Sequence, residues 1–287
     1  MLCLGASGQE IVFETTSPYH HIQVIDRNRL RTLHFDKSTQ SHISLDDPLK
    51  GHFEYIEYFH MPWLWDDQIK SVLMIGLGGS SIQRAYQAHY PEVKTTTIEL
   101  DPKVIDVAKT YFNFKETDNM KVLSGDGRMY MRRTKERYDA IFLDAYAANR
   151  YGTYIPYPLV TREFFALARE RLSDRGVLVY NVIGNVTSSE NIVGAIYKTL
   201  KTSFPQVYMF PAETTPNVVL MATLSSETVT LSQLQARLEA LNETRAITFT
   251  NFKLRLERFQ AEPPASVGRS RVLTDDFAPV DGLLQVE

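Results

Sequence analysis

The sequence feature that most constrains the fold is a pair of apolar runs with distinctive ends. Val72-Leu-Met-Ile-Gly-Leu-Gly-Gly-Ser80 ends in glycines, and Thr95-Thr-Thr-Ile-Glu-Leu-Asp101 ends in acids. Glycines at the end of a buried strand let a ligand approach the backbone closely. An acid after the second strand can accept hydrogen bonds from a ribose. The pair therefore predicts a nucleoside-binding edge of an α/β sheet.

From residue 70 onward, strand-like and helix-like segments alternate. Regular alternation of this kind predicts a mainly parallel sheet with helices on both faces. The last two strands, 206–210 and 217–223, are expected to form an antiparallel hairpin at the sheet edge. The other expected strands are 71–75, 94–100, 120–123, 138–143 and 177–182. The expected helices are 81–89, 102–111, 127–133, 161–172, 188–202 and 231–241.

The first part of the chain has a different pattern, with short alternating segments separated by polar clusters. Four strands are expected, at 10–14, 22–26, 31–35 and 42–45, with turns at 26–29 and 36–39. The aromatic segment 52–62 is expected to be helical. We therefore predict a small antiparallel β domain over residues 1–62 and a nucleoside-binding domain over residues 63–287.

Composition narrows the classes of partner. The net charge of −3 and the pI of about 6.2 give no basic surface of the kind that nucleic acids need. No apolar run approaches the roughly 18 residues that span a membrane. The single cysteine, Cys3, excludes a disulfide within the chain. No spacing of His, Cys, Asp and Glu resembles a zinc site, so no metal is expected. We expect a cytoplasmic protein without nucleic-acid or membrane partners.

Glycines or acids end four successive predicted strands. After the glycine loop come Glu99, the segment Ser124-Gly-Asp-Gly127, and Asp144. Open parallel sheets bind their ligands outside the carboxyl ends of the strands. Each acid taken alone is as well explained as a cap of the following helix. The loop lacks a P-loop signature and, with Ser81 at the third position, a full G-x-G-x-x-G, which disfavours a dinucleotide.

Several motifs together resemble the polyamine aminopropyltransferases, the spermidine synthase family. The resemblance runs in order over about residues 13 to 182, and the chain is identified as a divergent member. The matching segments are Phe35-Asp-Lys-Ser-Thr-Gln40, Phe53-Glu-Tyr-Ile-Glu57, Gly76-Leu-Gly-Gly79, Glu99-Leu-Asp101, Gly125-Asp-Gly127 and the strand ending in Asp144.

The resemblance implies a Rossmann-like class I methyltransferase fold with an N-terminal β domain. It also implies decarboxylated S-adenosylmethionine as donor, a small amine as acceptor, and a homodimer or homotetramer. Glu99 would hold the ribose hydroxyls and Asp126 the adenine amino group, while Gln40 and Tyr55 would line the pocket for donor and acceptor. The glycines that would surround the donor are Gly76, Gly78, Gly79 and Gly127.

Asp144 matches the carboxylate that takes a proton from the attacking amine in this family. Aminopropyl transfer is a direct displacement, so the protein has to align the reactants and keep the amine unprotonated. Tyr146, two residues later, is a second catalytic candidate that could supply a hydroxyl or an aromatic wall for a cation. Ordinary packing explains Tyr146 equally well.

Three positions depart from the family pattern. Gly79 stands where an acid usually holds the donor's amine, Ile56 where His or Gln usually stands, and Ala147 where an acid usually helps to bind the acceptor. Two other functions therefore stay open. One is a methyltransferase that uses S-adenosylmethionine itself, and the other is a non-catalytic nucleoside-binding relative.

Two further segments carry expectations. The aromatic segment Tyr151-Gly-Thr-Tyr-Ile-Pro-Tyr157 is expected to be a loop that acts as a mobile lid. The histidines His20, His21 and His34 are expected to be surface or strand residues rather than ligands.

Overall fold

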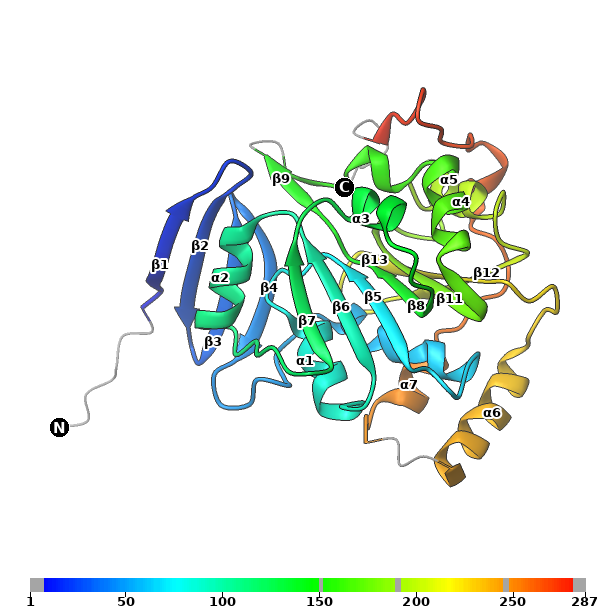
Figure 1. The fold of residues 1–287 in the computed structure, drawn as a ribbon, viewed down its shortest axis with the longest axis horizontal. Helices are drawn as coiled ribbons and strands as arrows, with labels where there is room; N and C mark the ends of the chain where they lie inside the picture. Colours follow the sequence, from blue (N-terminus) through cyan, green and yellow to red (C-terminus); the bar gives the residue numbers. More distant parts are fainter. Residues whose placement is uncertain (1–7, 150–151, 189–191, 245–247, 281–287) are drawn as a thin grey trace.

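The computed structural model describes residues 8–149, 152–188, 192–244 and 248–280. Two main sheets organise these residues (Figure 1). A four-stranded antiparallel sheet is formed by the N-terminal part of the chain, and a seven-stranded mixed sheet by the rest. The α/β class, the mainly parallel sheet and the N-terminal β sheet predicted from the sequence are confirmed. No helix of the described residues is both long and apolar enough to cross a bilayer.

The seven-stranded sheet has the order β12-β13-β11-β8-β5-β6-β7. The strands β5 to β8 and β11 are parallel, while β13 pairs antiparallel with β11 and β12, as predicted for an edge hairpin. The strand bounds are β5 Ser71–Ile75, β6 Lys94–Glu99, β7 Met120–Ser124, β8 Tyr138–Leu143, β11 Leu172–Ile183, β12 Gln206–Pro211 and β13 Asn217–Thr223.

Alternate residues of each central strand enter different cores. In β5, Met74 packs into one apolar cluster and Ile75 into the other, and in β8 Phe142 and Leu143 do the same. Successive side chains of a strand point to opposite faces, so the sheet is buried on both sides. The helices on one face are α3 Gly127–Arg133, α4 Arg162–Glu170 and α5 Ile192–Leu200. The opposite face carries η1 Glu54–Leu64, α1 Ser81–His89, α6 Leu231–Thr244 and α7 Phe252–Leu256.

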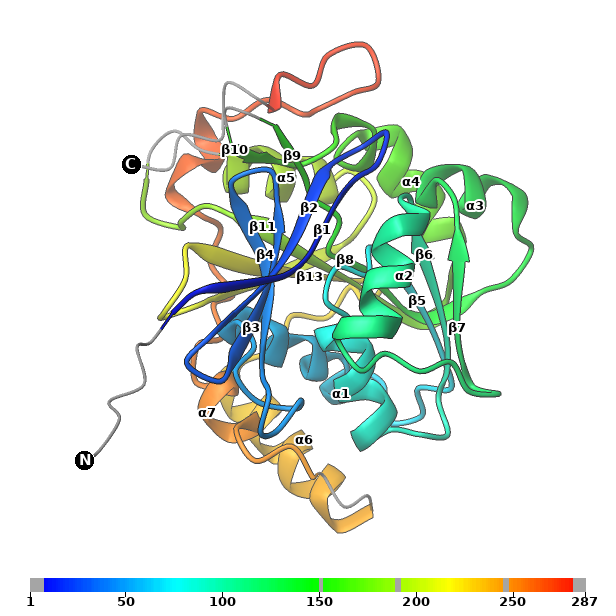
Figure 2. The same ribbon diagram turned by 90° about the vertical axis from the view of Figure 1, so that its left-hand side faces the viewer.

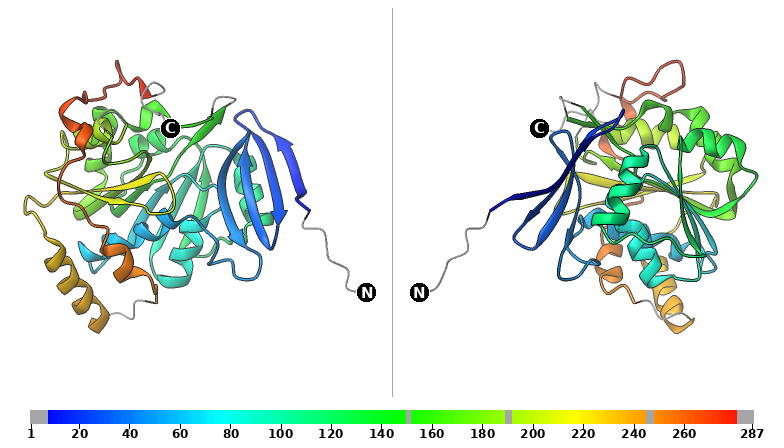
Figure 3. Two further views of the ribbon diagram at one scale, coloured as in Figure 1. Left: turned by 180° about the vertical axis from the view of Figure 1, so that it is seen from behind. Right: turned by 60° about the vertical axis from the view of Figure 1, so that its left-hand side comes forward.

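The N-terminal sheet lies at one end of the molecule, beside α2 Pro102–Tyr111 (Figures 1 and 2). Its apolar face forms a small core with Val104 and Val107 of α2 and with Phe112. Figure 3 shows the same contact from two other sides. The strands run in the order β1-β2-β3-β4, as a simple meander. Their bounds are β1 Glu10–Thr16, β2 His21–Arg27, β3 Leu30–Phe35 and β4 Ser38–Ser44.

In the N-terminal part, one predicted strand boundary needs correction, and the helix predicted over 52–62 is confirmed with a different helix type. The fourth strand begins at Ser38 rather than at 42, because Asp36 adopts a positive φ of 52° and closes the turn within two residues. The segment expected to be helical is a 3-10 helix, η1, with a proline, Pro62, inside it. All of η1 is buried against the large sheet. The division at residue 62 stays a prediction.

Candidate active site

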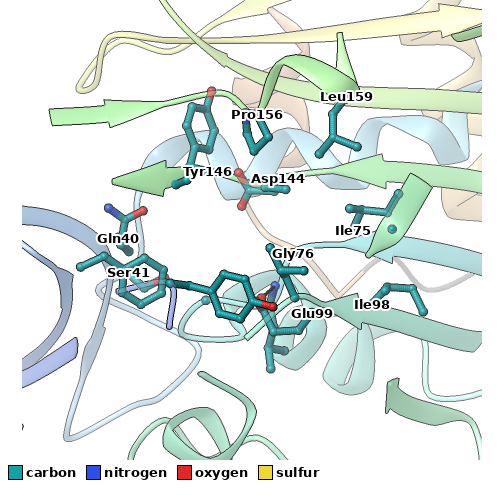
Figure 4. Close-up of a pocket in the computed structure, with 18 of the residues that line it drawn as sticks. Gln40, Ser41, Ile75, Gly76, Ile98, Glu99, Asp144, Tyr146, Pro156 and Leu159 are labelled. Carbon is teal, nitrogen blue, oxygen red and sulfur yellow. Dashed lines mark hydrogen bonds between the residues drawn. The ribbon is translucent and has the colours of Figure 1, made fainter. Parts of the chain in front are cut away.

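A cavity of about 280 Å³ opens at the carboxyl ends of four neighbouring strands (Figure 4). Residues at or just after the ends of β5, β6, β7 and β8 line it, so the four predicted strand ends converge on one space. The N-terminal sheet and η1 close the opposite side with Phe35, Gln40, Ser41, Tyr55 and Ile56. The size suits a small organic ligand.

Gly76 and Gly127 are required by close packing at these strand ends. Gly76 has a φ of +98°, and a Cβ there would overlap the backbone carbonyl of Asp144. A Cβ on Gly127 would lie 2.6 Å from the side chain of Ile75. Gly78 has a φ of +49° and also lines the cavity. The glycines therefore bring the β5 and β8 ends together and leave the floor of the cavity to backbone atoms.

Gly79 is not among the residues that line the cavity, so its expected place beside the donor stays a prediction. A Cβ at Gly79 would lie 2.6 Å from the Cβ of Ser41, and the Ser41 Oγ accepts a hydrogen bond from Gly79 N at 3.0 Å. Ser41, on β4, lines the cavity instead. The space that a side chain at 79 would need is thus taken by a hydroxyl from the other sheet.

Most backbone N–H groups of the glycine loop are already occupied. Gly76 N donates to Ile98 O at 2.9 Å, and Leu77 N donates to Oε2 of Glu99 at 2.9 Å. Ser80 N donates to Leu77 O at 2.8 Å, and the Gly78 N–H acts on Glu99 by lowering the pKa of its carboxyl. With Gly79 N held by Ser41, most N–H groups of this loop are already used.

Behind the loop lies a buried cation. The guanidinium of Arg84, in α1, donates to the carbonyls of Gly79 and Phe112 and to the Ser80 hydroxyl. Its hydrogen bonds within the described residues go to carbonyl and hydroxyl oxygens and to no carboxylate. Burial lowers the pKa of Arg84 to about 10, which leaves it charged at neutral pH.

Glu99 ends β6 and faces the cavity floor. Its Oε2 accepts from Leu77 N and its Oε1 from Asp101 N, both at 2.9 Å. The carboxyl lies deep in the molecule but keeps part of its surface open to the cavity. Burial raises the pKa of Glu99, while the backbone hydrogen bonds act in the opposite direction. These contacts fix the carboxylate at the bottom of the cavity, below Gly76 in Figure 4.

Asp126 lines the cavity and also caps a helix. Its Oδ1 accepts from Met129 N at 2.7 Å, which makes it the N-cap of α3. Asp101, by contrast, caps α2 through Lys103 N and does not line the cavity. Asp101 and Asp126 are therefore both helix caps. Of these two acids, Asp126 also lines the cavity.

Asp144 follows β8 on the other side of Gly76 from Glu99 (Figure 4). Its Oδ1 accepts from Asn181 Nδ2 at 2.8 Å, and its Oδ2 accepts from the Tyr55 hydroxyl at 3.2 Å. Burial raises the pKa of the Asp144 carboxyl to about 6, although both hydrogen bonds favour the charged form. This carboxyl can hold or release a proton near neutral pH.

Tyr146 and Gln40 also line the cavity. The Tyr146 hydroxyl donates to Asn181 O at 2.9 Å and accepts from Ile183 N at 2.8 Å, so it is tied to β11. A part for Tyr146 in the chemistry would therefore come from its ring. The Gln40 amide, on β4, donates to Ser38 O at 3.3 Å and to Thr153 Oγ1 at 3.4 Å.

Ser41 and His20 are two of several lining residues that the sequence did not indicate. His20 is buried and stacks on Phe35 at a centroid distance of 4.2 Å, and its Nδ1 has no hydrogen-bond partner among the described residues. Burial lowers its pKa. The expectation of a surface or strand role is wrong for His20, because the chain enters β2 directly over the cavity. Its position in the short segment between β1 and β2 gave no signal of this burial in the sequence.

The expected lid is not a simple loop. Its described part contains β10 Gly152–Tyr154, which pairs antiparallel with β9 Ala147–Asn149, and the start of the 3-10 helix η2 Tyr157–Leu159. Tyr151 lies outside the described residues. Tyr154 and Pro156 line the cavity, so this segment forms one of its walls. Its mobility stays a prediction.

The charges that face the cavity are of one sign. Among the described residues that line it, the carboxylic acids are Glu99, Asp126 and Asp144, and no Lys or Arg is present. In the same part of the chain, no group of three His, Cys, Asp or Glu side chains is placed to hold a metal ion. The cavity therefore attracts a cationic ligand more than an anionic one.

Comparison with known proteins agrees with this geometry. A sequence model of the spermine/spermidine synthase domain matches residues 52–234. The chain belongs to the spermine/spermidine synthase family. A polyamine aminopropyltransferase of Vibrio vulnificus is 31% identical over 285 residues, with 94% of this chain and 90% of that protein covered.

Solved structures show the same fold as this member of the synthase family. A probable spermidine synthase from Corynebacterium glutamicum has a TM-score of 0.69 at 18% identity, covering 97% of this chain and all of that chain. Human methyltransferase-like protein 13 in complex with SAH has a TM-score of 0.59 at 24% identity, covering 67% of this chain and 92% of that chain. The fold is therefore shared by the synthases and by that methyltransferase-like protein.

Proposed function

We propose that this chain transfers an aminopropyl group from decarboxylated S-adenosylmethionine to an amine, with Asp144 as the proton acceptor. The observation that carries the proposal is the position of Asp144. Its carboxyl faces the cavity at the β8 end, with a pKa of about 6 and oriented by Tyr55 and Asn181. Membership of the synthase family supports the same reaction.

The donor's adenosine would occupy the end of the cavity at β6 and β7. Glu99 would accept hydrogen bonds from the ribose hydroxyls, and Asp126 from the adenine amino group. Gly76, Gly78 and Gly127 leave room for the nucleoside beside the backbone. The sulfonium would then lie near Gly76, between the two acidic ends of the cavity (Figure 4).

The lining of the cavity favours a donor that lacks a carboxylate. S-adenosylmethionine carries one. This carboxylate would meet three acids, no Lys or Arg among the described lining residues, and a loop in which most N–H groups are already bonded. The decarboxylated donor carries only positive charge. Its amine can be held by the neutral oxygens of Gln40 and Ser41, which line the wall on β4.

The transfer is a direct displacement in which the protein makes no covalent bond. The amine's lone pair forms a bond to the carbon next to sulfur, the C–S bond breaks, and sulfur keeps the bonding electrons as a neutral thioether. The positive charge moves to nitrogen, and a proton passes from nitrogen to Asp144. A carboxylate with a pKa of about 6 is deprotonated at neutral pH and can accept it.

A second candidate is methyl transfer from S-adenosylmethionine. Gly79 removes an acid that would repel the donor's carboxylate, and the Arg84 guanidinium lies directly behind Gly79 without a carboxylate partner in the described residues. Arg84 does not line the cavity, however, and its donors are used by carbonyl and hydroxyl oxygens. We therefore rank this candidate second.

Product analysis distinguishes the two reactions. The purified chain is incubated with each donor and a mixture of primary amines, and the products are identified by mass spectrometry. We expect 5′-methylthioadenosine and an aminopropylated amine from the decarboxylated donor only. S-adenosylhomocysteine formed from S-adenosylmethionine would instead establish methyl transfer, and the absence of both nucleosides would favour a non-catalytic relative.

A further inference from the structure

We propose that the acceptor of this enzyme is an amine with a single positive charge and an uncharged remainder, rather than a diamine or polyamine. The proposal rests on the proposed function and specifies its acceptor class. It is carried by the surroundings of Asp144, where the residues that the structure describes give the cavity one carboxylate and otherwise neutral walls.

The three acids that line the cavity are not equivalent. Glu99 and Asp126 stand at the ends of β6 and β7, where backbone N–H groups of the glycine loop and of α3 already bond to them. Asp144, at the end of β8, is the acid next to Tyr55 and Tyr146. An amine that attacks a carbon near Gly76 therefore finds one carboxylate, and that carboxylate is needed for its own proton.

Among the described residues, the rest of the wall around Asp144 carries no charge. Ile56 follows Tyr55 on η1, Ala147 follows Tyr146 at the start of β9, and Pro156 lies on the segment after β10. A second ammonium on the acceptor would face these side chains. Burial of a charge without a partner is unfavourable, so binding of a second ammonium here is opposed.

Glu54 and Glu57 flank the lining residues Tyr55 and Ile56 in the sequence. Neither acid lines the cavity, so neither supplies the missing negative charge. On η1, Glu57 accepts from Arg255 Nε at 2.5 Å and from Asn251 Nδ2 at 3.0 Å. Glu54 accepts from Arg255 Nη1 at 3.1 Å and from Thr214 N at 2.8 Å. Both carboxylates are thus already engaged in hydrogen bonds and share the charge of Arg255 on the side of η1 that faces α7.

Two further acids, Asp36 and Asp101, lie near the lining residue His20 without lining the cavity themselves, and Asp101 is already hydrogen-bonded. Asp101 caps α2 through Lys103 N at 2.9 Å and accepts a hydrogen bond from the Ser17 hydroxyl. The neutral oxygens of Gln40 and Ser41 can hold one ammonium, and the donor brings that one. An uncharged tail on the acceptor fits the space that is left, between Ile56, Ala147 and Pro156.

The test compares amines that differ in one charge only. Rates of 5′-methylthioadenosine release from decarboxylated S-adenosylmethionine are measured with butylamine and with 1,4-diaminobutane, and with the hexyl pair. We expect kcat/KM to be at least tenfold higher for the monoamine of each pair. A higher kcat/KM for the diamines would overturn the proposal while leaving aminopropyl transfer established.

A pair of variants checks that the missing charge is the cause. Ala147→Asp adds a carboxylate to the wall, and Ala147→Asn adds the same volume without the charge. We expect Ala147→Asp to raise the diamine-to-monoamine ratio of kcat/KM about tenfold over Ala147→Asn, which corresponds to one moderate ion pair. Equal ratios in the two variants would contradict this cause. If no amine releases the thioether nucleoside from the wild type, the proposed function itself fails, and the acceptor class with it.

Discussion

The carboxylates at the two ends of the cavity are held by different kinds of hydrogen-bond donor. At the β6 and β7 ends, Glu99 and Asp126 are held by backbone N–H groups: Leu77 and Asp101 donate to Glu99, and Met129 donates to Asp126. At the β8 end, the described partners of the Asp144 carboxyl are side chains, Asn181 from β11 and Tyr55 from η1. The nucleoside end therefore depends on the backbone of neighbouring strand-to-helix turns, whereas the reacting end depends on side chains from segments far apart in the chain. Substitutions should affect the two ends in different ways.

The largest effect is expected at the reacting end. Asp144→Asn removes the proton acceptor but keeps the size and one hydrogen-bonding oxygen, so we expect kcat to fall by about 10²- to 10⁴-fold. Binding of 5′-methylthioadenosine should change less than about threefold, because that ligand has no amine to deprotonate. Steady-state rates and calorimetry measure the two quantities.

The same substitution should make the protein more stable at neutral pH. The pKa of Asp144 is raised to about 6 in the folded state, from an ordinary value of 3.8. The folded protein therefore binds this proton more tightly, and stability falls as pH rises from about 4 to 6. Asp144→Asn should raise Tm by a few degrees at pH 7 and much less at pH 4. A lower Tm for Asp144→Asn than for the wild type at pH 7 would show that the charged Asp144 carboxylate does not destabilise the fold.

At the nucleoside end, a substitution should weaken ligand binding rather than slow the chemical step. Glu99→Gln removes a charged acceptor of hydrogen bonds, each worth about 1.5–3 kcal/mol, so donor affinity should fall roughly 10- to 150-fold. The affinity for 5′-methylthioadenosine should fall equally, because both ligands carry the ribose. Asp106→Asn, an exposed carboxylate on α2, is the matched control and should bind both ligands normally. Unchanged affinity in Glu99→Gln would show that the ribose does not bind at this end of the cavity.

A smaller effect tests the contact between the two sheets at the glycine loop. Gly79→Ala places a Cβ 2.6 Å from the Ser41 Cβ, and such overpacking costs about 1–3 kcal/mol of unfolding free energy. Ser41→Gly in the same chain should restore most of that loss. Gly268→Ala, where a Cβ meets open space, is the control in denaturant unfolding and should not destabilise. Full stability of Gly79→Ala alone would show that the sheets do not meet there.

The smallest effect is a shift in pH dependence. kcat/KM should fall below about pH 6 as Asp144 takes up a proton. The Tyr55 hydroxyl donates to the charged form of Asp144, so its removal raises the pKa of that carboxyl. Tyr55→Phe should move the acid limb upward by on the order of one pH unit. An unmoved or lowered limb would assign the titration to another group.

Much of the nucleoside end could be predicted from the sequence, for a physical reason. A run such as 72–80 specifies a buried strand, a glycine turn and a helix start within one short segment. The positions of Gly76, Glu99, Asp126 and Asp144 at the cavity follow from that regular pattern together with the edge rule for parallel sheets. The resemblance to the family motifs indicated, in addition, which of these segments contribute to one site.

The reacting end could not be predicted as well, because its contacts join segments far apart in the chain. Ser41 lies against Gly79 only because β4 crosses the glycine loop, and Asn181 reaches Asp144 from the neighbouring strand. The burial of His20 and the pairing of β9 with β10 likewise depend on how the N-terminal sheet and the lid segment pack over the cavity. Local propensity does not determine such contacts.

The most direct test of the account is a calorimetric titration of the wild-type chain with the two sulfonium donors. The donors differ only in one carboxylate, which the cavity meets with acids and with loop N–H groups that are already bonded. We predict that decarboxylated S-adenosylmethionine binds at least tenfold more tightly than S-adenosylmethionine. Equal or tighter binding of S-adenosylmethionine would contradict the account and favour methyl transfer.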